Sequence, residues 1–299
     1  MIAKIDDIES AFDICNVARR VHRNIPSIAF TPNMAYNPSL ARSGHLLRHL
    51  TSAASLPKKV CLIVGAGDAT GSALARRFHR EGYLVACARR QGGKLDEGVV
   101  KELGEGCRGF GVDARKEEDV IKLFNDVESS MGAISVCIHN IGGNVRFGLL
   151  ETTERVYRKV WELCGLTAFL VGREAAKRML AHKQGGTIIF TGATASIRGS
   201  ANFAAFSGGM HAKRSLAQSM AREFGPQGLH IAHVIIDGPI RTDFVKGLMG
   251  EKAFQEKVEG AQVLFPEDIA EAYMSLVKQN RSAWTFEMDL RPFSESFGS

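Results

Sequence analysis

The sequence has none of the features that mark membrane-spanning, zinc-binding or low-complexity proteins. No apolar stretch among its 299 residues approaches the roughly 18–20 residues that a membrane-spanning helix needs. Its six cysteines form no Cys-x-x-Cys pair, so no zinc ribbon and no other metal site is predicted. Cys61, Cys87 and Cys137 lie in apolar runs, where buried free thiols are expected. These absences predict a soluble intracellular protein of the cytoplasm or the mitochondrial matrix.

The net charge of +6 has two interpretations. A basic patch could attract nucleic acid or acidic lipid. Alternatively, the excess reflects a phosphate-binding site together with a basic arm. Because no run of five or more like charges is present, we favour the second interpretation and expect no nucleic-acid partner.

Residues 1–57 differ in composition from the rest of the chain. Between Asp13 and Asp68 there is no acidic residue, whereas five arginines lie in that stretch. This resembles a mitochondrial transit sequence, but Asp6, Asp7 and Glu9 make the start too acidic for one. We predict an ordered basic N-terminal arm that packs on the domain or on a partner in a larger assembly, with a targeting role as the second possibility.

From Lys58 onward, apolar strand-sized runs alternate with segments of helical spacing. Strands are expected at about 60–64, 83–88, 108–112, 135–139, 186–191, 230–236 and 284–290, and the longer helices at 117–131, 155–181 and 205–224. Strands that alternate with helices form right-handed crossovers and a parallel sheet covered on both faces. The sequence therefore predicts one doubly wound α/β domain over residues 58–299, with about seven strands.

A glycine-rich turn follows the first expected strand and precedes the first expected helix. It contains Gly65, Gly67 and Gly71, with Asp68 and Thr70 between them. Such a turn lets the backbone approach a pyrophosphate closely, and the helix N-terminus supplies free N–H groups and a positive dipole end. The position of this turn in the chain predicts a dinucleotide site.

At this point the chain resembles the short-chain dehydrogenase/reductase family, whose phosphate turn reads Gly-x-x-x-Gly-x-Gly. Gly65 and Gly71 match its first and last glycines, and Ala69 replaces the middle one. The resemblance extends over about residues 58–293 and implies a Rossmann-type fold. It adds these cofactor residues: Asp113 at the adenine, Asn140 and Gly142 of an Asn-Ala-Gly-like motif, and Gly238 and Thr242 near the nicotinamide.

The end of the second strand bears on the choice between NAD and NADP. An NAD enzyme places Asp or Glu there to bond the ribose 2′-hydroxyl. Here Ala88 occupies that position and is followed by Arg89 and Arg90. Because a guanidinium can grip a 2′-phosphate with two hydrogen bonds, we predict NADP(H) as the cofactor rather than a merely solvated arginine pair.

The catalytic residues that the resemblance implies are missing. The family uses a Tyr-x-x-x-Lys pair, a Ser and an Asn; counting by the family's spacing places Phe206, Met210, Ala193 and Cys164 there. Phenylalanine has no proton to give, and methionine carries no charge that could lower the pKa of a phenol. Thr194, His211 and Lys213 are candidate replacements, although each also fits a helix-surface or interface role.

Two functions remain open at this stage. The chain could be an atypical NADP(H)-dependent oxidoreductase that reduces a carbonyl or an activated double bond. It could instead be a catalytically silent member that serves as a scaffold, a sensor or a subunit of a larger assembly. In either case helices 155–181 and 205–224 resemble the family's dimer-forming pair and predict a homodimer or tetramer.

Overall fold

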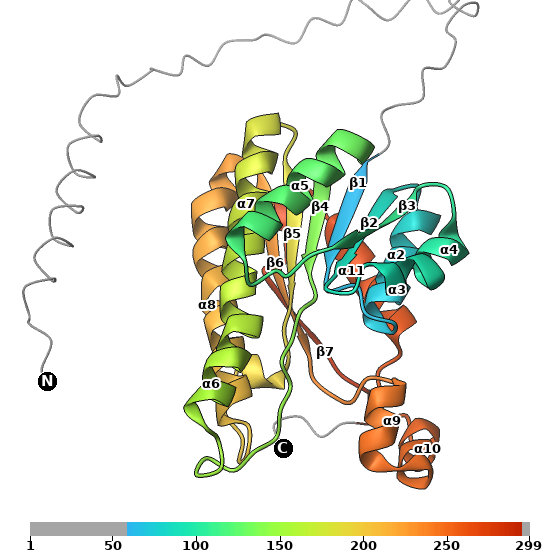
Figure 1. The fold of residues 1–299 in the computed structure, drawn as a ribbon, viewed down its shortest axis with the longest axis vertical. Helices are drawn as coiled ribbons and strands as arrows, with labels where there is room; N and C mark the ends of the chain where they lie inside the picture. Colours follow the sequence, from blue (N-terminus) through green and yellow to red (C-terminus); the bar gives the residue numbers. More distant parts are fainter. Residues whose placement is uncertain (1–58, 295–299) are drawn as a thin grey trace, which may run out of the picture. The chain divides into compact units, whose positions relative to one another are not determined.

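The computed structural model describes residues 59–294 and shows a seven-stranded parallel sheet in the order β3-β2-β1-β4-β5-β6-β7 (Figure 1). The predicted Rossmann-type, doubly wound α/β fold is confirmed. The strands are β1 (Val60–Val64), β2 (Leu84–Arg89), β3 (Cys107–Gly111), β4 (Ile134–His139), β5 (Gly186–Thr191), β6 (Leu229–Ile236) and β7 (Glu287–Leu290). The predicted basic arm, residues 1–57, lies outside the described residues.

Helices cover both faces of the sheet. Helices α5, α7 and α8 pack on one face, and α2, α3, α4 and α11 pack on the other (Figure 1). The helices are α2 (Thr70–Arg80), α3 (Gly93–Glu97), α4 (Val99–Leu103), α5 (Glu117–Met131), α6 (Glu154–Trp161), α7 (Thr167–His182), α8 (Ala204–Phe224), α9 (Asp243–Met249), α10 (Glu251–Glu259) and α11 (Pro266–Val277). None of the helices in the described part of the chain is both long and apolar enough to cross a membrane.

Strand β1 shows why the core has two halves. All five of its side chains are buried. Val60, Leu62 and Val64 pack with the cluster under α5, α7 and α8, whereas Cys61 and Ile63 pack with the cluster under α2 and α11. Alternate side chains of a strand point to opposite faces, so a strand covered on both faces must be apolar throughout.

The strand order places a crevice at the carboxyl ends of β1 and β4. β1 pairs with β2 on one side and with β4 on the other, so the chain crosses over in opposite directions from this point. In doubly wound sheets a ligand site forms at such a reversal, outside the carboxyl ends of the strands.

The structure departs from the predicted helix 155–181 in one respect. This segment is two helices, α6 and α7, joined by a π-helical turn at Glu162–Leu166. The turn contains Cys164, and below it the Thr167 hydroxyl donates to the Leu163 carbonyl at 2.7 Å. A π turn shifts the helical register, which apolar spacing alone does not reveal, and such turns are frequent at functional sites.

Candidate functional site

Two adjoining cavities open at the carboxyl edge of the sheet. The smaller, about 500 Å³, lies over the ends of β2 and β3, and the larger, about 1040 Å³, lies over the ends of β5 and β6. Both are lined by Gly65, Gly67, Asn140, Ile141 and Gly142. An elongated ligand that follows the sheet edge could therefore occupy both cavities.

The glycine turn forms the boundary between the cavities. Gly65 has a φ of +96°, and a Cβ there would lie 2.6 Å from the Asn140 carbonyl oxygen. A Cβ at Gly67 would meet no atom within 4 Å, so its backbone is bare towards the crevice. Within the described residues, the N–H groups of Ala69 and Thr70 at the start of α2 have no hydrogen-bond acceptor. Free N–H groups beside bare backbone fit a pyrophosphate.

Arginines line the outer end of the smaller cavity. Arg89 Nη1 donates to Asp68 Oδ1 at 2.7 Å, which links the end of β2 to the glycine turn. Arg90 also lines the cavity, is exposed, and makes no ion pair with any described residue. The predicted pair of arginines therefore consists of one engaged guanidinium and one open guanidinium.

Asp113 lines the same cavity, but its carboxylate is already occupied. Arg115 grips it through Nε at 2.8 Å and through Nη2 at 2.6 Å. These hydrogen bonds lower the pKa of Asp113 to about 2. The carboxylate is thus ionised at neutral pH, and it lines the cavity together with the guanidinium of Arg115.

A chain of hydrogen bonds holds the crossover point. The Asn140 amide donates to the Gly65 carbonyl at 3.0 Å, and the Thr191 hydroxyl donates to Asn140 Oδ1 at 2.9 Å. Tyr273 of α11 contacts the same hydroxyl oxygen at 2.8 Å, and because that hydroxyl donates to Asn140, Tyr273 donates here. Burial raises the pKa of Tyr273 well above its ordinary value, so it remains a donor. The chain fixes Asn140 against the glycine turn.

Comparisons with known proteins agree with this architecture. The family model described as enoyl-(acyl carrier protein) reductase matches residues 65–288. A short-chain dehydrogenase from Rhodopseudomonas palustris is 41% identical, with a TM-score of 0.67 over 79% of this chain and 99% of that one. The chain belongs to the short-chain dehydrogenase/reductase family of oxidoreductases.

More distant members show how far the resemblance extends. The uncharacterized oxidoreductase YuxG of Bacillus subtilis is 29% identical over 238 residues, which are 73% of this chain but only 34% of YuxG. The chain therefore spans about a third of that relative. An alcohol dehydrogenase from Thermococcus sibiricus, solved with 5-hydroxy-NADP, is 23% identical with a TM-score of 0.70 over 80% of this chain and 98% of that one.

The four positions assigned to the short-chain dehydrogenase tetrad lie together in one apolar cluster. Cys164, Phe206 and Met210 are buried in it, and Ala193 packs against it. Phe206 is 8% exposed and Met210 is 2% exposed, and both line the larger cavity beside Ala193. Within the described residues, no tyrosine, histidine or cysteine lines either cavity. This part of the cavity wall is therefore hydrocarbon.

Two glycines of α8 explain how this cluster is packed so closely. A Cβ at Gly209 would lie 2.8 Å from Cys164 Cβ, and one at Gly208 would lie 2.8 Å from the Tyr157 hydroxyl. α6 and the π turn therefore pack directly on the backbone of α8. Phe206 and Met210 are held in the cavity wall by this contact.

The structure places none of the three candidate replacements in the cavity wall. The Thr194 hydroxyl donates to Asp237, whose other oxygen pairs with Arg291 at 2.8 Å. His211 is exposed, and its ring bonds the Ser207 carbonyl at 2.9 Å. Lys213 is fully buried and bonds two backbone carbonyls behind the cavity.

The segment after β6 closes the larger cavity. Gly238 and Thr242, two of the predicted cofactor residues, both line it. The Thr242 oxygen accepts from the Val245 N–H at 3.0 Å and so caps α9, which leaves its hydroxyl proton free to donate. Residues of α9 and α10, including Phe254 and Val258, line the same cavity as Phe206.

Proposed function

We propose that the protein binds NADP(H) across the two cavities and carries out little or no classical carbonyl–alcohol chemistry. The observation that carries this proposal is the apolar cluster: Cys164, Phe206 and Met210, with Ala193 against it, lie where the family's tetrad would act. The glycine turn and the start of α2 form a cradle beside this cluster, and the cradle has the features that a dinucleotide needs. These are the bare Gly67 backbone and the free N–H groups at the start of α2.

The preference for NADP(H) over NAD(H) rests on the end of β2. Ala88 offers no carboxylate to a ribose 2′-hydroxyl, and Arg90 presents an unengaged guanidinium to the smaller cavity. A 2′-phosphate would supply the acceptor that Arg90 lacks. The Thermococcus sibiricus neighbour, which has the same fold, was solved with an NADP derivative. Arg90→Ala should weaken NADPH binding about tenfold and leave NADH binding unchanged.

The low carbonyl-reducing activity that we propose follows from the lack of a proton donor in the cavity wall. A nicotinamide would supply a hydride when bound, but an alcohol product also needs a proton at its oxygen. Phe206 has none, and Met210 neither charges the site nor holds a ribose hydroxyl. The hydroxyl of Thr191, which also lines the larger cavity, already donates to Asn140.

Two roles are compatible with such a site. The first is a catalytically silent member that uses the cofactor fold as a scaffold, a sensor or a subunit of a larger assembly. The second is reduction of an activated double bond, which depends less on a Tyr and Lys pair than alcohol oxidation does. The description of the matched family model, enoyl-(acyl carrier protein) reductase, and the apolar wall favour this second role as the alternative.

The test combines binding with turnover. NADPH fluorescence titration should show saturable binding, and NADPH consumption should then be followed with aldehydes, ketones, quinones and enoyl thioesters. We expect binding without consumption of NADPH by aldehydes or ketones. Consumption with enoyl thioesters alone would establish the double-bond reductase, and rapid consumption with a ketone would contradict the proposal.

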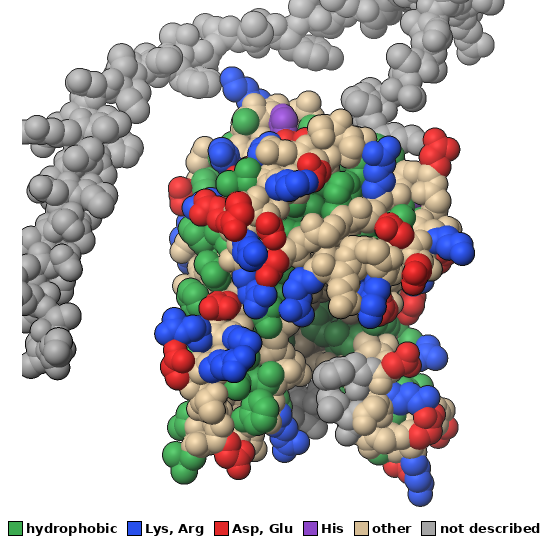
Figure 2. Space-filling view, viewed as in Figure 1, with side chains coloured by type: hydrophobic (Ala, Val, Ile, Leu, Met, Phe, Trp, Pro, Cys, Tyr) green, Lys and Arg blue, Asp and Glu red, His purple; other side chains and the backbone are tan. Residues whose placement is uncertain are grey.

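We also infer that the chain forms a homo-oligomer through α6, α7 and α8. Tyr157, Trp161 and Phe169 on α6 and α7 are between 42% and 45% exposed, and exposed apolar patches mark interaction sites. By contrast, Figure 2 shows Lys and Arg interspersed with Asp and Glu on the face that it draws, with no continuous basic surface. Light scattering should find a dimer or tetramer, and Trp161→Glu with Phe169→Glu should give monomers.

A further inference from the structure

Lys213 is a cation enclosed in the body of the domain. Its side chain, on α8, has no exposed surface. Its ammonium donates to the Ile141 carbonyl at 2.7 Å and to the Thr191 carbonyl at 3.0 Å. No carboxylate of the described residues forms an ion pair with it. A buried charge without a counter-charge destabilises a fold, so its presence calls for an explanation.

The two carbonyls that solvate Lys213 belong to the wall of the larger cavity. Ile141 follows β4 and Thr191 ends β5, and both line that cavity together with Phe206 and Met210. The ammonium thus ties the carboxyl ends of two neighbouring strands at the crossover point. Its charge lies directly behind the residues that a bound ligand would touch.

Three titratable groups surround the ammonium from the elements packed against it, and all three are held neutral. Burial, together with the charge of Lys213, lowers the pKa of His139 on β4. Burial lowers the pKa of His233 on β6 to about 4, and burial raises the pKa of the Cys164 thiol in the π turn.

The nearest carboxylate to this cluster belongs to Glu287 of β7. It bonds His233 Nδ1 at 3.0 Å and is held by Arg214 at 2.6 Å. Burial lowers the pKa of Lys213 to about 8, so it is mostly protonated at neutral pH. The positive charge of the cluster therefore rests on Lys213.

We propose that Lys213 is a positioning residue whose charge makes the site prefer the reduced nicotinamide cofactor over the oxidised one. The inference rests on the proposed NADP(H) site. The oxidised nicotinamide ring carries a positive charge, and the reduced ring carries none. A fixed cation behind the wall therefore repels NADP⁺ and leaves NADPH nearly unaffected. Because the ammonium is buried away from water, this repulsion is screened less than it would be in water.

The decisive experiment compares the affinities for the two forms of the cofactor. Lys213→Gln keeps hydrogen-bond donors for the two carbonyls but removes the charge. Fluorescence titration with NADPH, and displacement of NADPH by NADP⁺, give both dissociation constants. We expect the ratio of the NADP⁺ to the NADPH dissociation constant to fall about tenfold, through tighter binding of NADP⁺. Lys122→Gln, on the exposed surface of α5, is the matched control and should leave the ratio unchanged.

A second measurement covers the case in which Lys213→Gln does not fold. In the wild-type protein the same ratio should fall as the pH rises from about 7 to about 9.5, because Lys213 loses its proton in that window. A ratio that stays within about twofold of its starting value in a folded Lys213→Gln protein, or across this pH range, overturns the inference alone. If the wild-type protein binds neither nucleotide, the proposed function fails and this inference fails with it.

Discussion

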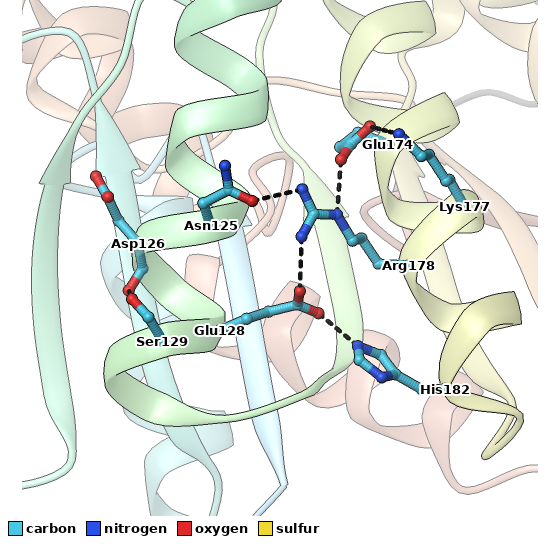
Figure 3. A network of polar contacts seen from close by, with 8 residues as sticks. All are labelled: Asn125, Asp126, Glu128, Ser129, Glu174, Lys177, Arg178 and His182. Atoms are coloured by element: carbon cyan, nitrogen blue, oxygen red, sulfur yellow. Dashed lines mark hydrogen bonds and ion pairs between the residues drawn. The ribbon is translucent and has the colours of Figure 1, made fainter.

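The two ends of the parallel sheet differ in whether their polar groups have partners within the protein. At the end where β4 and β5 begin, Arg178 of α7 bonds Glu174, Glu128 and Asn125 at 2.7, 3.0 and 2.7 Å (Figure 3). At the carboxyl end, Arg90 and the N–H groups at the start of α2 have no partner among the described residues. The first end, called the closed end below, joins α5 to α7. At the second, the open end, the donors line the two cavities.

Each of the two carboxylates at the closed end has two basic partners. Glu128 accepts from the ring of His182 at 2.7 Å as well as from Arg178, so both of its oxygens are engaged (Figure 3). Glu174 is almost fully buried and has both Arg178 and Lys177 beside it. Satisfied buried charges rigidify a fold, so this end is expected to be rigid.

The largest effect is expected from a variant that adds a proton donor to the wall of the larger cavity. Phe206→Tyr combined with Met210→Lys places a phenol and a cation in the wall of the larger cavity. General acid–base catalysis contributes roughly 10²–10⁴-fold, so NADPH consumption with a small aldehyde should rise by about 10²-fold or more. Spectrophotometry at the NADPH absorbance band measures it.

Two single variants are the controls for this experiment. Met210→Leu should remain inactive, and Phe206→Tyr alone should gain less than the double variant, because an unassisted phenol keeps a high pKa. If the wild-type protein already matches the double variant, proton transfer takes place through another group and the apolar wall has been misinterpreted.

Disrupting the closed end should cost stability and leave binding intact. Arg178→Ala removes a cationic partner from both Glu174 and Glu128 and leaves their buried charges partly uncompensated. The free energy of unfolding should therefore fall by about 3–5 kcal/mol. Urea denaturation measures this loss. Lys177→Ala, whose side chain is 71% exposed and 3.8 Å from Glu174, should cost less than about 1 kcal/mol. A loss of NADPH affinity in Arg178→Ala would show that the two ends are coupled.

Acid should destabilise the fold through His233, which lies between the two ends on β6. Its pKa is about 4 in the folded protein and 6.5 ordinarily, so between those values only the unfolded chain takes up the proton. The stability due to this histidine is complete above about pH 6.5, is lost as the pH falls towards 4, and amounts to at most about 3 kcal/mol. His233→Gln should flatten the dependence of the unfolding free energy on pH in that window. An unchanged slope would assign it to other groups.

A matched pair of glycine variants separates the effect of backbone strain on stability from the effect of the glycine turn on NADPH binding. Gly65→Ala and Gly132→Ala both put a methyl group on a residue of positive φ, +96° and +103°. Each should lose about 1–2 kcal/mol of stability through the backbone. Only Gly65→Ala also collides with the Asn140 carbonyl, so it should lose more stability and should lose NADPH affinity at least about tenfold. Equal NADPH affinity of the two variants would mean that the glycine turn does not hold the cofactor.

Much of the fold could be predicted from local patterns. The strands 60–64 and 186–191 and the helix 117–131 were predicted with the bounds that the structure shows, because uninterrupted apolar runs and helical spacing are strong signals. The last strand begins at Glu287 rather than at Trp284, since Trp284 stacks on the ring of His230 at 4.9 Å between centroids and does not join the sheet.

The sequence predicted which segments form the site but not how their side chains pair. The glycine turn and the position of Phe206 follow from residue order along the chain. The Arg89–Asp68 pair, the Arg115–Asp113 pair and the Thr191–Tyr273 contact do not, because they depend on side-chain rotamers and packing that only the folded protein fixes. Lys213 was a candidate replacement for the missing catalytic groups. The structure instead places it under two carbonyls, where burial on α8 directs it.

The proposed function requires an intact nucleotide site beside a wall that cannot donate a proton. The most direct test is to titrate one preparation of the wild-type protein with NADPH and then to follow NADPH absorbance after adding an aldehyde or a ketone. We expect saturable binding of NADPH, tighter than that of NADH, and absorbance that falls no faster than in buffer. Sustained NADPH oxidation by the wild-type protein, or no binding of NADPH, would contradict it.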